Sequence, residues 1–308
     1  MQGMRIFAVV CVLGLLSRLF SHFLVGSENA LAWLVDLASH WQWIFLLGLL
    51  ISVGVTVWSS RRWAVLLLAV PLPWLTASAH APASGKTGGL LKVASVNVNL
   101  SNRDIEPLAA WLSKEQVDIV AVLEVSTGYS SKLRALAEYP FKRIVPDRGP
   151  FGIALISRHP LLHSKVIYDA DGIAHIEAQV RWQDHVISFV AIHPMPPLSP
   201  HYHAVRDSKL RALADAMVAS RAPAILAGDF NATPWSSAFS GLAEQGLHRV
   251  TGLAPSWPAK MQGMLGIPID HVLVTTHWAV VASQIGPDLG SDHLPVLVGL
   301  SLIDRQPF

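Results

Sequence analysis

The stretch "AILAGDFNATPW", residues 224–235, decides the fold class because it has the pattern of a buried strand that ends in polar side chains. Small and apolar residues fill its first half, which is typical of a strand covered on both faces. Gly228 then permits a close or bent backbone at the strand end. We therefore expect Asp229 and Asn231 at a strand tip, where functional groups often gather.

Strands of this kind recur through the C-terminal two thirds of the chain. The other apolar or alternating runs are "LLKVASVNV", "DIVAVLEV", "GIALISR", "AHIEAQVRW", "VISFVAIH", "IDHVLVT" and "LPVLVGLSL". Between them, the spacing of apolar residues predicts helices over residues 104–116, 130–139 and 203–220. Strands interspersed with helices predict an α/β domain in which helices pack on sheets.

The first 80 residues have a different composition. The whole chain is 52% hydrophobic and 14% charged, and only four basic and two acidic residues lie before residue 81. Apolar runs there predict about three transmembrane helices, at residues 6–25, 41–58 and 63–79. Arg18 lies inside the first run, and Pro71 and Pro73 interrupt the third, so the middle run is the clearest.

The charges around these runs predict an orientation. Arg5 precedes the first run, and Arg61 and Arg62 separate the second from the third, whereas the loop between the first two holds acidic residues. The positive-inside rule then places the N-terminus in the cytoplasm and the rest of the chain on the periplasmic side of a cell membrane. A cleaved signal peptide is the alternative for the first run, but no clear cleavage site follows it.

The domain organisation follows from these differences. We expect a transmembrane region over residues 1–80, a linker rich in Ala, Ser, Gly and Pro over 81–89, and one external domain over 90–308. After residue 80 lie 19 of the 23 basic and 19 of the 21 acidic residues, which argues against a strongly basic nucleic-acid surface. Cys11 is the single cysteine, so an intrachain disulfide and a cysteine metal site are both excluded.

Several predicted strands carry an acid, an amide or a histidine at one end. The set is Asn97, Glu124, His193, Asp229, Asn231, Asp270, Asp292 and His293. Side chains at strand ends can converge on one edge of a sheet, and carboxylate and amide oxygens suit Mg²⁺. A hard cation and preorganised donors are the main help that hydrolysis of a phosphoester needs.

The motifs around these residues resemble those of the endonuclease/exonuclease/phosphatase superfamily. "SVNV", "VLEV", "AIHPMP", "GDFNATPW", "IDHVLV" and "GSDHLP" occur in the order of that family over residues 90–303. The resemblance implies a two-sheet α/β sandwich whose strand ends form a divalent-metal phosphoesterase site, with Mg²⁺ as the cofactor and Mn²⁺ as the alternative. Glu124 resembles the principal metal-binding carboxylate, and Asn97 and Asp292 join or support that site. Asn99 stands where some nucleases carry an acid.

The same resemblance implies the catalytic roles. Asp229 resembles the residue that orients or deprotonates the attacking water, and Asn231 its phosphate-contacting partner. His293, oriented by Asp270, faces the phosphoryl oxygen. His193 matches the second histidine of the deoxyribonuclease and sphingomyelinase branches. A carboxylate partner such as Asp270 also favours the protonated, donating form of His293.

The sequence gives weaker evidence that other polar residues belong to the site. Arg206 lies near the site by helix placement, so either a phosphate contact or a surface salt bridge is expected. We interpret the remaining candidates as ordinary polar residues: His201, His203, His271 and His277.

Two classes of function remain. The first is a membrane-anchored, metal-dependent phosphoesterase, whose partners are the bilayer and either a phospholipid-like or a nucleic-acid substrate. The neutral charge and the tether favour lipid, because nuclease binding draws heavily on basic contacts. The second is a catalytically silent, membrane-tethered binding module of the same fold. The complete set of acids and histidines favours the enzyme, and the sequence assigns neither monoester nor diester preference nor an oligomeric state.

Overall fold

A computed structural model describes residues 2–24, 28–58, 60–78 and 89–303. Contacts divide the chain into two compact units. The helical unit comprises Met1–Ser78, Pro196–Leu210 and Ala232–Ser240, and the sheet unit comprises Ala79–Met195, Arg211–Asn231 and Gly241–Phe308. The predicted linker lies outside the described residues except for Gly89, and the predicted domain boundaries stay a prediction.

The N-terminal part of the helical unit is built from apolar helices. They are α1 Gln2–Phe23, α2 Ala30–Ser39, α3 Gln42–Val57, the 3₁₀ helix η1 Arg61–Ala69 and α4 Leu72–Thr76. α1 and α3 pack together through the buried side chains of Cys11, Leu15, Leu49 and Val53. Both helices also expose large apolar side chains, among them Phe7 and Leu13 of α1 and Leu50 and Ile51 of α3.

The prediction of about three transmembrane helices is wrong. Among the described residues only α1 is long and apolar enough to cross a membrane, over Gln2–Ser21, and α2 and α3 pass the same test only as a pair bent by 67°. Residues 61–76 form η1 and α4 instead of one long helix, because Pro71 and Pro73 interrupt the run. Proline lacks the backbone N–H that a continuous helix needs.

The sheet unit contains two six-stranded sheets. The strands are β1 Leu91–Asn97, β2 Ile119–Leu123, β3 Phe141–Val145, β4 Ile153–Ser157, β5 Leu161–Tyr168, β6 Ala174–Trp182, β7 His185–Ile192, β8 Ala224–Asp229, β9 Leu247–Arg249, β10 Asp270–Thr275, β11 Trp278–Ile285 and β12 Val296–Leu302. One sheet has the order β11-β12-β1-β2-β4-β3 and the other β5-β6-β7-β8-β10-β9. β1 pairs with β2 in parallel, as does β7 with β8, and the other pairs are antiparallel.

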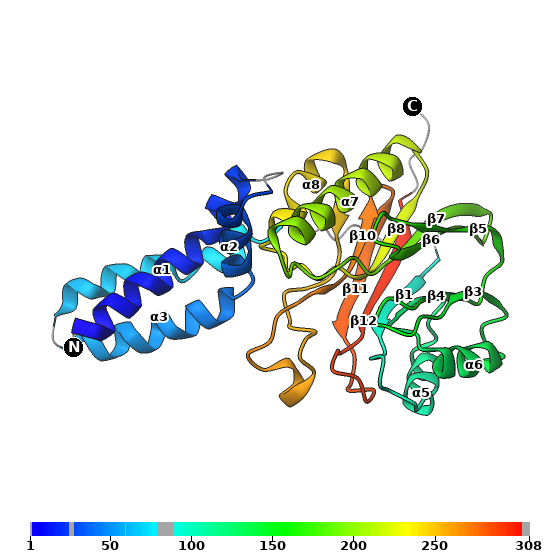
Figure 1. The fold of residues 1–308 in the computed structure, drawn as a ribbon, viewed down its shortest axis with the longest axis horizontal. Helices are drawn as coiled ribbons and strands as arrows, with labels where there is room; N and C mark the ends of the chain where they lie inside the picture. The colour runs from blue at the N-terminus through cyan, green and yellow to red at the C-terminus, as the bar shows by residue number, and fades with distance from the viewer. Residues whose placement is uncertain (1, 25–27, 59, 79–88, 304–308) are drawn as a thin grey trace. The chain divides into compact units, whose positions relative to one another are not determined.

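Helices complete the layers. The remaining helices are α5 Glu106–Glu115, α6 Thr127–Ala135, α7 Pro200–Ala219, η2 Ser237–Phe239, α8 Leu242–Gln245 and η3 Lys260–Gly263. α5 and α6 lie beside the sheet that contains β1, β3 and β4 (Figure 1). Trp111 and Tyr129 of these helices pack in one cluster with Val96 and Val120 of that sheet. Two mixed sheets with covering helices agree with the predicted α/β sandwich.

The register of the strands brings the polar strand ends to one edge. Asn97 pairs with Leu123, so Glu124 is the next residue beside it. In the second sheet Ile192 pairs with Gly228, and Asp270 pairs with Asp229. The interior between the sheets is apolar, with Val93, Phe189 and Val272 among its buried side chains. The candidate site residues therefore lie at the strand ends, at the border of this apolar interior.

Candidate active site

Asn97 and Glu124 lie together where the parallel strands β1 and β2 end. Asn97 Nδ2 donates to Glu124 Oε1 at 3.0 Å and to Asp229 Oδ2 at 3.2 Å. Leu100 N donates to Glu124 Oε2 at 2.8 Å. Asn97 is buried and Glu124 is half-buried. One amide therefore contacts a carboxylate from each sheet. The two carboxylates lie close together, so negative charge is concentrated at this edge.

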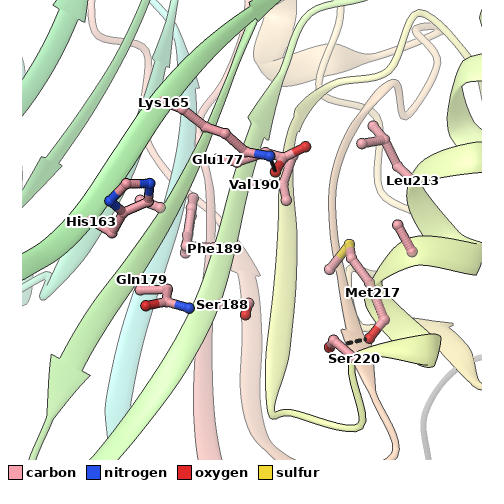
Figure 2. Close-up of a pocket in the computed structure, with 12 residues that line it drawn as sticks. His163, Lys165, Glu177, Gln179, Ser188, Phe189, Val190, Leu213, Met217 and Ser220 are labelled. Atoms are coloured by element: carbon pink, nitrogen blue, oxygen red, sulfur yellow. Dashed lines mark hydrogen bonds and ion pairs between the residues drawn. The ribbon is translucent and has the colours of Figure 1, made fainter.

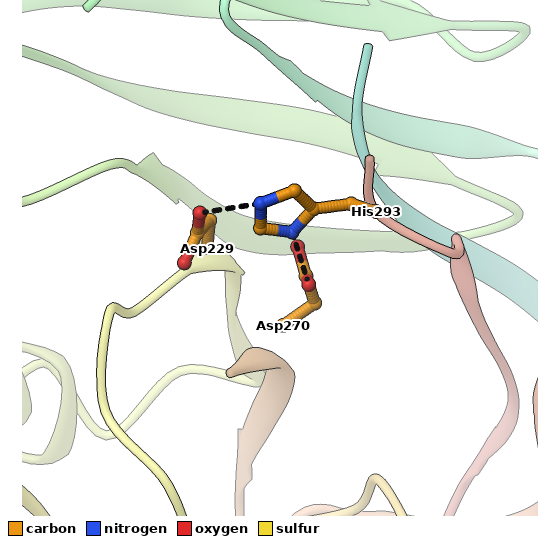
Figure 3. Close-up of side chains that lie close together, drawn as sticks. All are labelled: Asp229, Asp270 and His293. Carbon is orange, nitrogen blue, oxygen red and sulfur yellow. Dashed lines mark hydrogen bonds and ion pairs between the residues drawn. The ribbon is translucent and has the colours of Figure 1, made fainter. Parts of the chain in front are cut away.

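Asp229, Asp270 and His293 form a buried cluster next to this pair. His293 Nδ1 lies 2.8 Å from Asp270 Oδ2, and His293 Nε2 lies 3.7 Å from Asp229 Oδ2. Figure 3 shows the imidazole ring between the two carboxylates. Ser256 Oγ accepts from the backbone N–H of Asp270 at 3.1 Å, which fixes the start of β10. The sequence predictions paired Asp270 with His293 and had no signal for Ser256.

The charges in this cluster shift its pKa values. Burial lowers the pKa of His293, but the carboxylates of Asp270 and Asp229 outweigh burial and raise it to about 10. Burial raises the pKa of Asp270, and the charge of Asp229 adds to this while His293 opposes it. The ligand atoms of the three residues lie within 4.8 Å of one another, close enough for a metal ion. Asp270 engages His293 Nδ1, so Nε2 is the ring nitrogen left to face a ligand or a substrate.

His193 and Asn231 border Asp229 from the ends of β7 and β8. His193 Nε2 lies 3.5 Å from Asp229 Oδ2. The backbone N–H of Asn231 donates to Asp229 Oδ1 at 2.9 Å, and Asn231 Nδ2 donates to Pro194 O at 3.0 Å. The ring of Phe151 packs against that of His193, with centroids 5.5 Å apart. All the predicted catalytic residues therefore gather around Asp229.

Asp292 joins the group through Asn99. Asn99 Nδ2 donates to Asp292 Oδ1 at 2.6 Å, and Trp257 Nε1 donates to Asp292 Oδ2 at 3.2 Å. Asn99 N in turn donates to Asn97 Oδ1 at 3.0 Å. An acid at position 99 would repel Asp292, whereas the amide holds it in place. The sequence analysis noted only that Asn99 replaces an acid found in some nucleases, and it did not predict that Trp257 belongs to the site.

The backbone at this edge adopts uncommon conformations. The φ angles of Asn99, Glu124 and Asn231 are 63°, 61° and 48°, in the left-handed region that glutamate seldom enters. Gly228 is needed for close packing, because a Cβ there would lie 1.9 Å from Ile192 O. Such strain persists only where the surroundings over-determine it, and it is concentrated at functional sites.

Arg206 is not on the surface. Its side chain is fully buried in the helical unit, where Nη2 lies 2.8 Å from both Asp36 Oδ2 and Asp207 Oδ1. Ser236 Oγ accepts from Nη2 at 3.0 Å. Both expectations for Arg206, a phosphate contact and a surface salt bridge, are therefore wrong. A guanidinium enclosed by two carboxylates cannot reach a substrate.

Three of the other four candidate histidines contact side-chain hydroxyl groups. His203 is buried and lies 2.9 Å from Ser237 Oγ in the helical unit. His271 Nδ1 lies 2.8 Å from Thr251 Oγ1, and His277 Nδ1 lies 3.1 Å from Thr275 Oγ1. His201 is exposed. Their interpretation as ordinary polar residues agrees with these contacts.

Two hollows in the sheet unit differ in how close they lie to the strand-end site. One, of about 300 Å³, lies between β5–β7 and the C-terminal half of α7 (Figure 2). Its charged groups Lys165 and Glu177 satisfy each other at 2.8 Å. The other, of about 770 Å³, shares Asn99 and Leu100 with the strand-end site. Only the second hollow therefore adjoins the residues described above.

These observations define a class of protein: a two-sheet sandwich with acidic side chains at the ends of its strands. Comparisons with known proteins identify this class. Residues 94–293 match the Endonuclease/Exonuclease/phosphatase family. The chain belongs to this family, whose members generally hydrolyse phosphoester bonds and typically depend on a divalent metal. Among curated protein sequences, none matches this chain.

Solved structures show the same fold. The endonuclease/exonuclease/phosphatase from Beutenbergia cavernae DSM 12333 is 22% identical with a TM-score of 0.58, over 69% of this chain and 72% of that one. The Bacteroides vulgatus protein is 20% identical with a TM-score of 0.57, over 70% of this chain and 100% of that one. D. rerio TDP2, complexed with a single-strand DNA product, is 16% identical with a TM-score of 0.54, over 69% of this chain and 99% of that one.

Proposed function

We propose that this chain is a membrane-anchored, divalent-metal-dependent phosphoesterase that hydrolyses phosphodiester or phosphomonoester bonds by attack of water. The observation that carries the proposal is the convergence of Asn97, Glu124, Asp229 and the Asp270–His293 pair on one edge of the sandwich. A fold of this family without these acids would support only binding. Their joint presence supports catalysis.

The residues at the edge suit a cation. Glu124 and Asp229 lie close enough to share one amide donor, Asn97 Nδ2, so two carboxylates face the same point of the edge. Carboxylate oxygens are the ligands that Mg²⁺ and Mn²⁺ prefer, and one or two carboxylates suffice for Mg²⁺. Glu124 would hold the ion, with Asn97 and Asp292 in support. When bound, it would supply positive charge that stabilises the developing charge on the phosphoryl oxygens.

Each of the remaining residues has a proposed role in the reaction. Asp229 Oδ2 faces both histidines and is placed to orient or deprotonate the attacking water. His293 binds Asp270 through Nδ1, so Nε2 is directed to the reacting group and can donate to a phosphoryl oxygen. Asn231 carries two amide hydrogens, so it can serve the substrate as well as Pro194 O. His193 completes the donor set.

A substrate panel tests this function. Purified full-length chain is incubated with Mg²⁺ or Mn²⁺ and bis(p-nitrophenyl) phosphate, single-stranded DNA or phospholipid vesicles. We expect turnover of the nitrophenyl diester that EDTA abolishes and added Mg²⁺ restores, because the edge needs a cation. The relative rates on DNA and vesicles assign the natural class. A folded chain that turns over none of the three would favour the binding module.

The membrane anchor is proposed to be α1, with α3 packed against it. Arg5 lies near the start of α1, and the positive-inside rule then favours a cytoplasmic N-terminus with the sheet unit on the periplasmic side. α2 is held against the protein, because Asp36 is buried beside Arg206 and Trp33 Nε1 donates to Pro197 O at 2.7 Å.

A labelling experiment tests this topology. Cys11 is the only cysteine, so Cys11→Ser combined with Asp184→Cys leaves one thiol, on the exposed turn between β6 and β7. In bacterial cells expressing the chain, with the outer membrane permeabilised, we expect a membrane-impermeant maleimide to label this thiol. Labelling that requires rupture of the inner membrane would place the sheet unit in the cytoplasm instead.

A further inference from the structure

The hollow of about 770 Å³ beside the strand-end site has three walls. They are the loop after β1 at residues 99–103, the start of α6 at residues 126–128, and the loop after β3 at residues 147–148. This volume lies within the range of small-molecule sites, about 300–1,000 Å³. None of the side chains assigned to catalysis above lines it, so it can hold a part of the substrate away from the reacting bond.

The hollow and the proposed metal site share one wall. Asn99 holds Asp292 at 2.6 Å through its Nδ2, and the N–H of Leu100 holds Glu124 at 2.8 Å. Asn99 Oδ1 also accepts from Ser101 N at 2.8 Å, which closes the loop into a tight turn. A group bound in the hollow would therefore lie one loop away from the phosphate that is cut.

The charge in the hollow is opposite to that of the metal site. Arg103 and Arg148 line it, with Asp147 as the one acid among its lining residues. Asp147 Oδ1 accepts from Gly149 N, so this carboxylate is engaged by its own loop. Lys132 Nζ donates to Arg103 O and adds a further positive charge nearby. The balance around the hollow is positive, whereas Glu124, Asp229 and Asp292 make the neighbouring edge negative.

Arg103 is held in position for binding. Its Nη1 donates to Leu100 O at 2.9 Å and to Ser126 Oγ at 3.0 Å. Ser126 also caps α6 by accepting from Tyr129 N at 3.3 Å. A guanidinium has five donors in a fixed fork, which suits phosphate oxygens, and a fixed one loses less conformational freedom on binding.

We propose that this hollow binds a second phosphate of the substrate, adjacent to the phosphate that is hydrolysed, through Arg103 and Arg148. The proposal rests on the proposed phosphoesterase function and deepens it, because it assigns a substrate with at least two phosphates. Such a group is supplied by the neighbouring phosphate of a nucleic-acid strand or by a phosphorylated lipid headgroup.

The test compares Arg103→Gln, Arg148→Gln and the double variant with wild type, and uses Arg181→Gln, at an exposed side chain of β6, as the control. Substrates are bis(p-nitrophenyl) phosphate, an oligothymidylate, and vesicles containing phosphatidylinositol 4-phosphate. We expect each arginine variant to lose about tenfold in kcat/KM on one substrate with two phosphates, mainly through KM. The nitrophenyl diester, which has one phosphate, should change less than twofold. The substrate that responds identifies the source of the second phosphate.

A binding measurement separates failure of this proposal from failure of the function. In EDTA, binding of a fluorescent oligothymidylate and of the same vesicles is measured for the wild type and the variants. Weaker binding in the arginine variants alone supports the subsite even if no substrate turns over. Equal losses on all substrates, unchanged binding, or no binding by the wild type would each overturn it. Arg148 is exposed, so Arg148→Gln keeps the test valid if Arg103→Gln perturbs folding.

Discussion

Replacing Asp229 by Asn should lower kcat for bis(p-nitrophenyl) phosphate by about 10³-fold. The substitution keeps the shape of the side chain and an acceptor for Asn231 N, which lies 2.9 Å from Oδ1. It removes the negative charge that lies 3.7 Å from His293 Nε2. It therefore also removes the carboxylate proposed to orient or deprotonate the attacking water. Steady-state kinetics at saturating Mg²⁺ measure the loss.

The matched control is Asp184→Asn, on the exposed turn between β6 and β7. It makes the same chemical change far from the strand ends, so kcat should stay within twofold of the wild type. Thermal unfolding of both variants shows whether the fold is kept. An Asp229→Asn variant that retains more than about a tenth of the wild-type rate would remove Asp229 from the proposed mechanism.

The second large effect concerns stability. Arg206→Met should destabilise the full-length chain by about 3–5 kcal/mol, because it leaves the carboxylates of Asp36 and Asp207 buried without their partner. Both carboxylates lie 2.8 Å from Nη2 in the structure. Thermal unfolding of the detergent-solubilised chain should show a fall in Tm of about 10 °C.

Two variants check the cause of that loss. Adding Asp36→Asn to Arg206→Met removes one of the stranded charges and should restore part of the Tm. Arg181→Met removes an exposed arginine of the sheet unit and should change the Tm by less than about 2 °C. If Arg206→Met behaves like Arg181→Met, the buried network does not hold the helical unit together.

The strand-end residues could be predicted because their pattern is local. Apolar runs such as residues 224–228 identify strands, and a polar residue after each run marks its tip. The parallel register of β1 with β2 and of β7 with β8 then brings those tips together. Motif order supplied the family, which the match over residues 94–293 confirms.

Contacts between distant segments left no such pattern. Arg206 is joined to Asp36 across 170 residues, and neither position has a spacing that announces a buried ion pair. Trp257 and Ser256 act through a loop, where the side-chain direction depends on the backbone path. The number of spans was overestimated for two reasons. Pro71 and Pro73 divide residues 61–76 into short helices. The middle run, interpreted as the clearest, forms the 16-residue α3, which passes the test for a span only together with α2.

The most direct test of the central claim is the rate of bis(p-nitrophenyl) phosphate hydrolysis as a function of Mg²⁺, measured for the wild type and Asp229→Asn side by side. We expect a wild-type rate that rises with Mg²⁺ and falls to background in EDTA, and an Asp229→Asn rate that stays near background throughout. A wild-type rate that is indifferent to EDTA, or shared by Asp229→Asn, would contradict it.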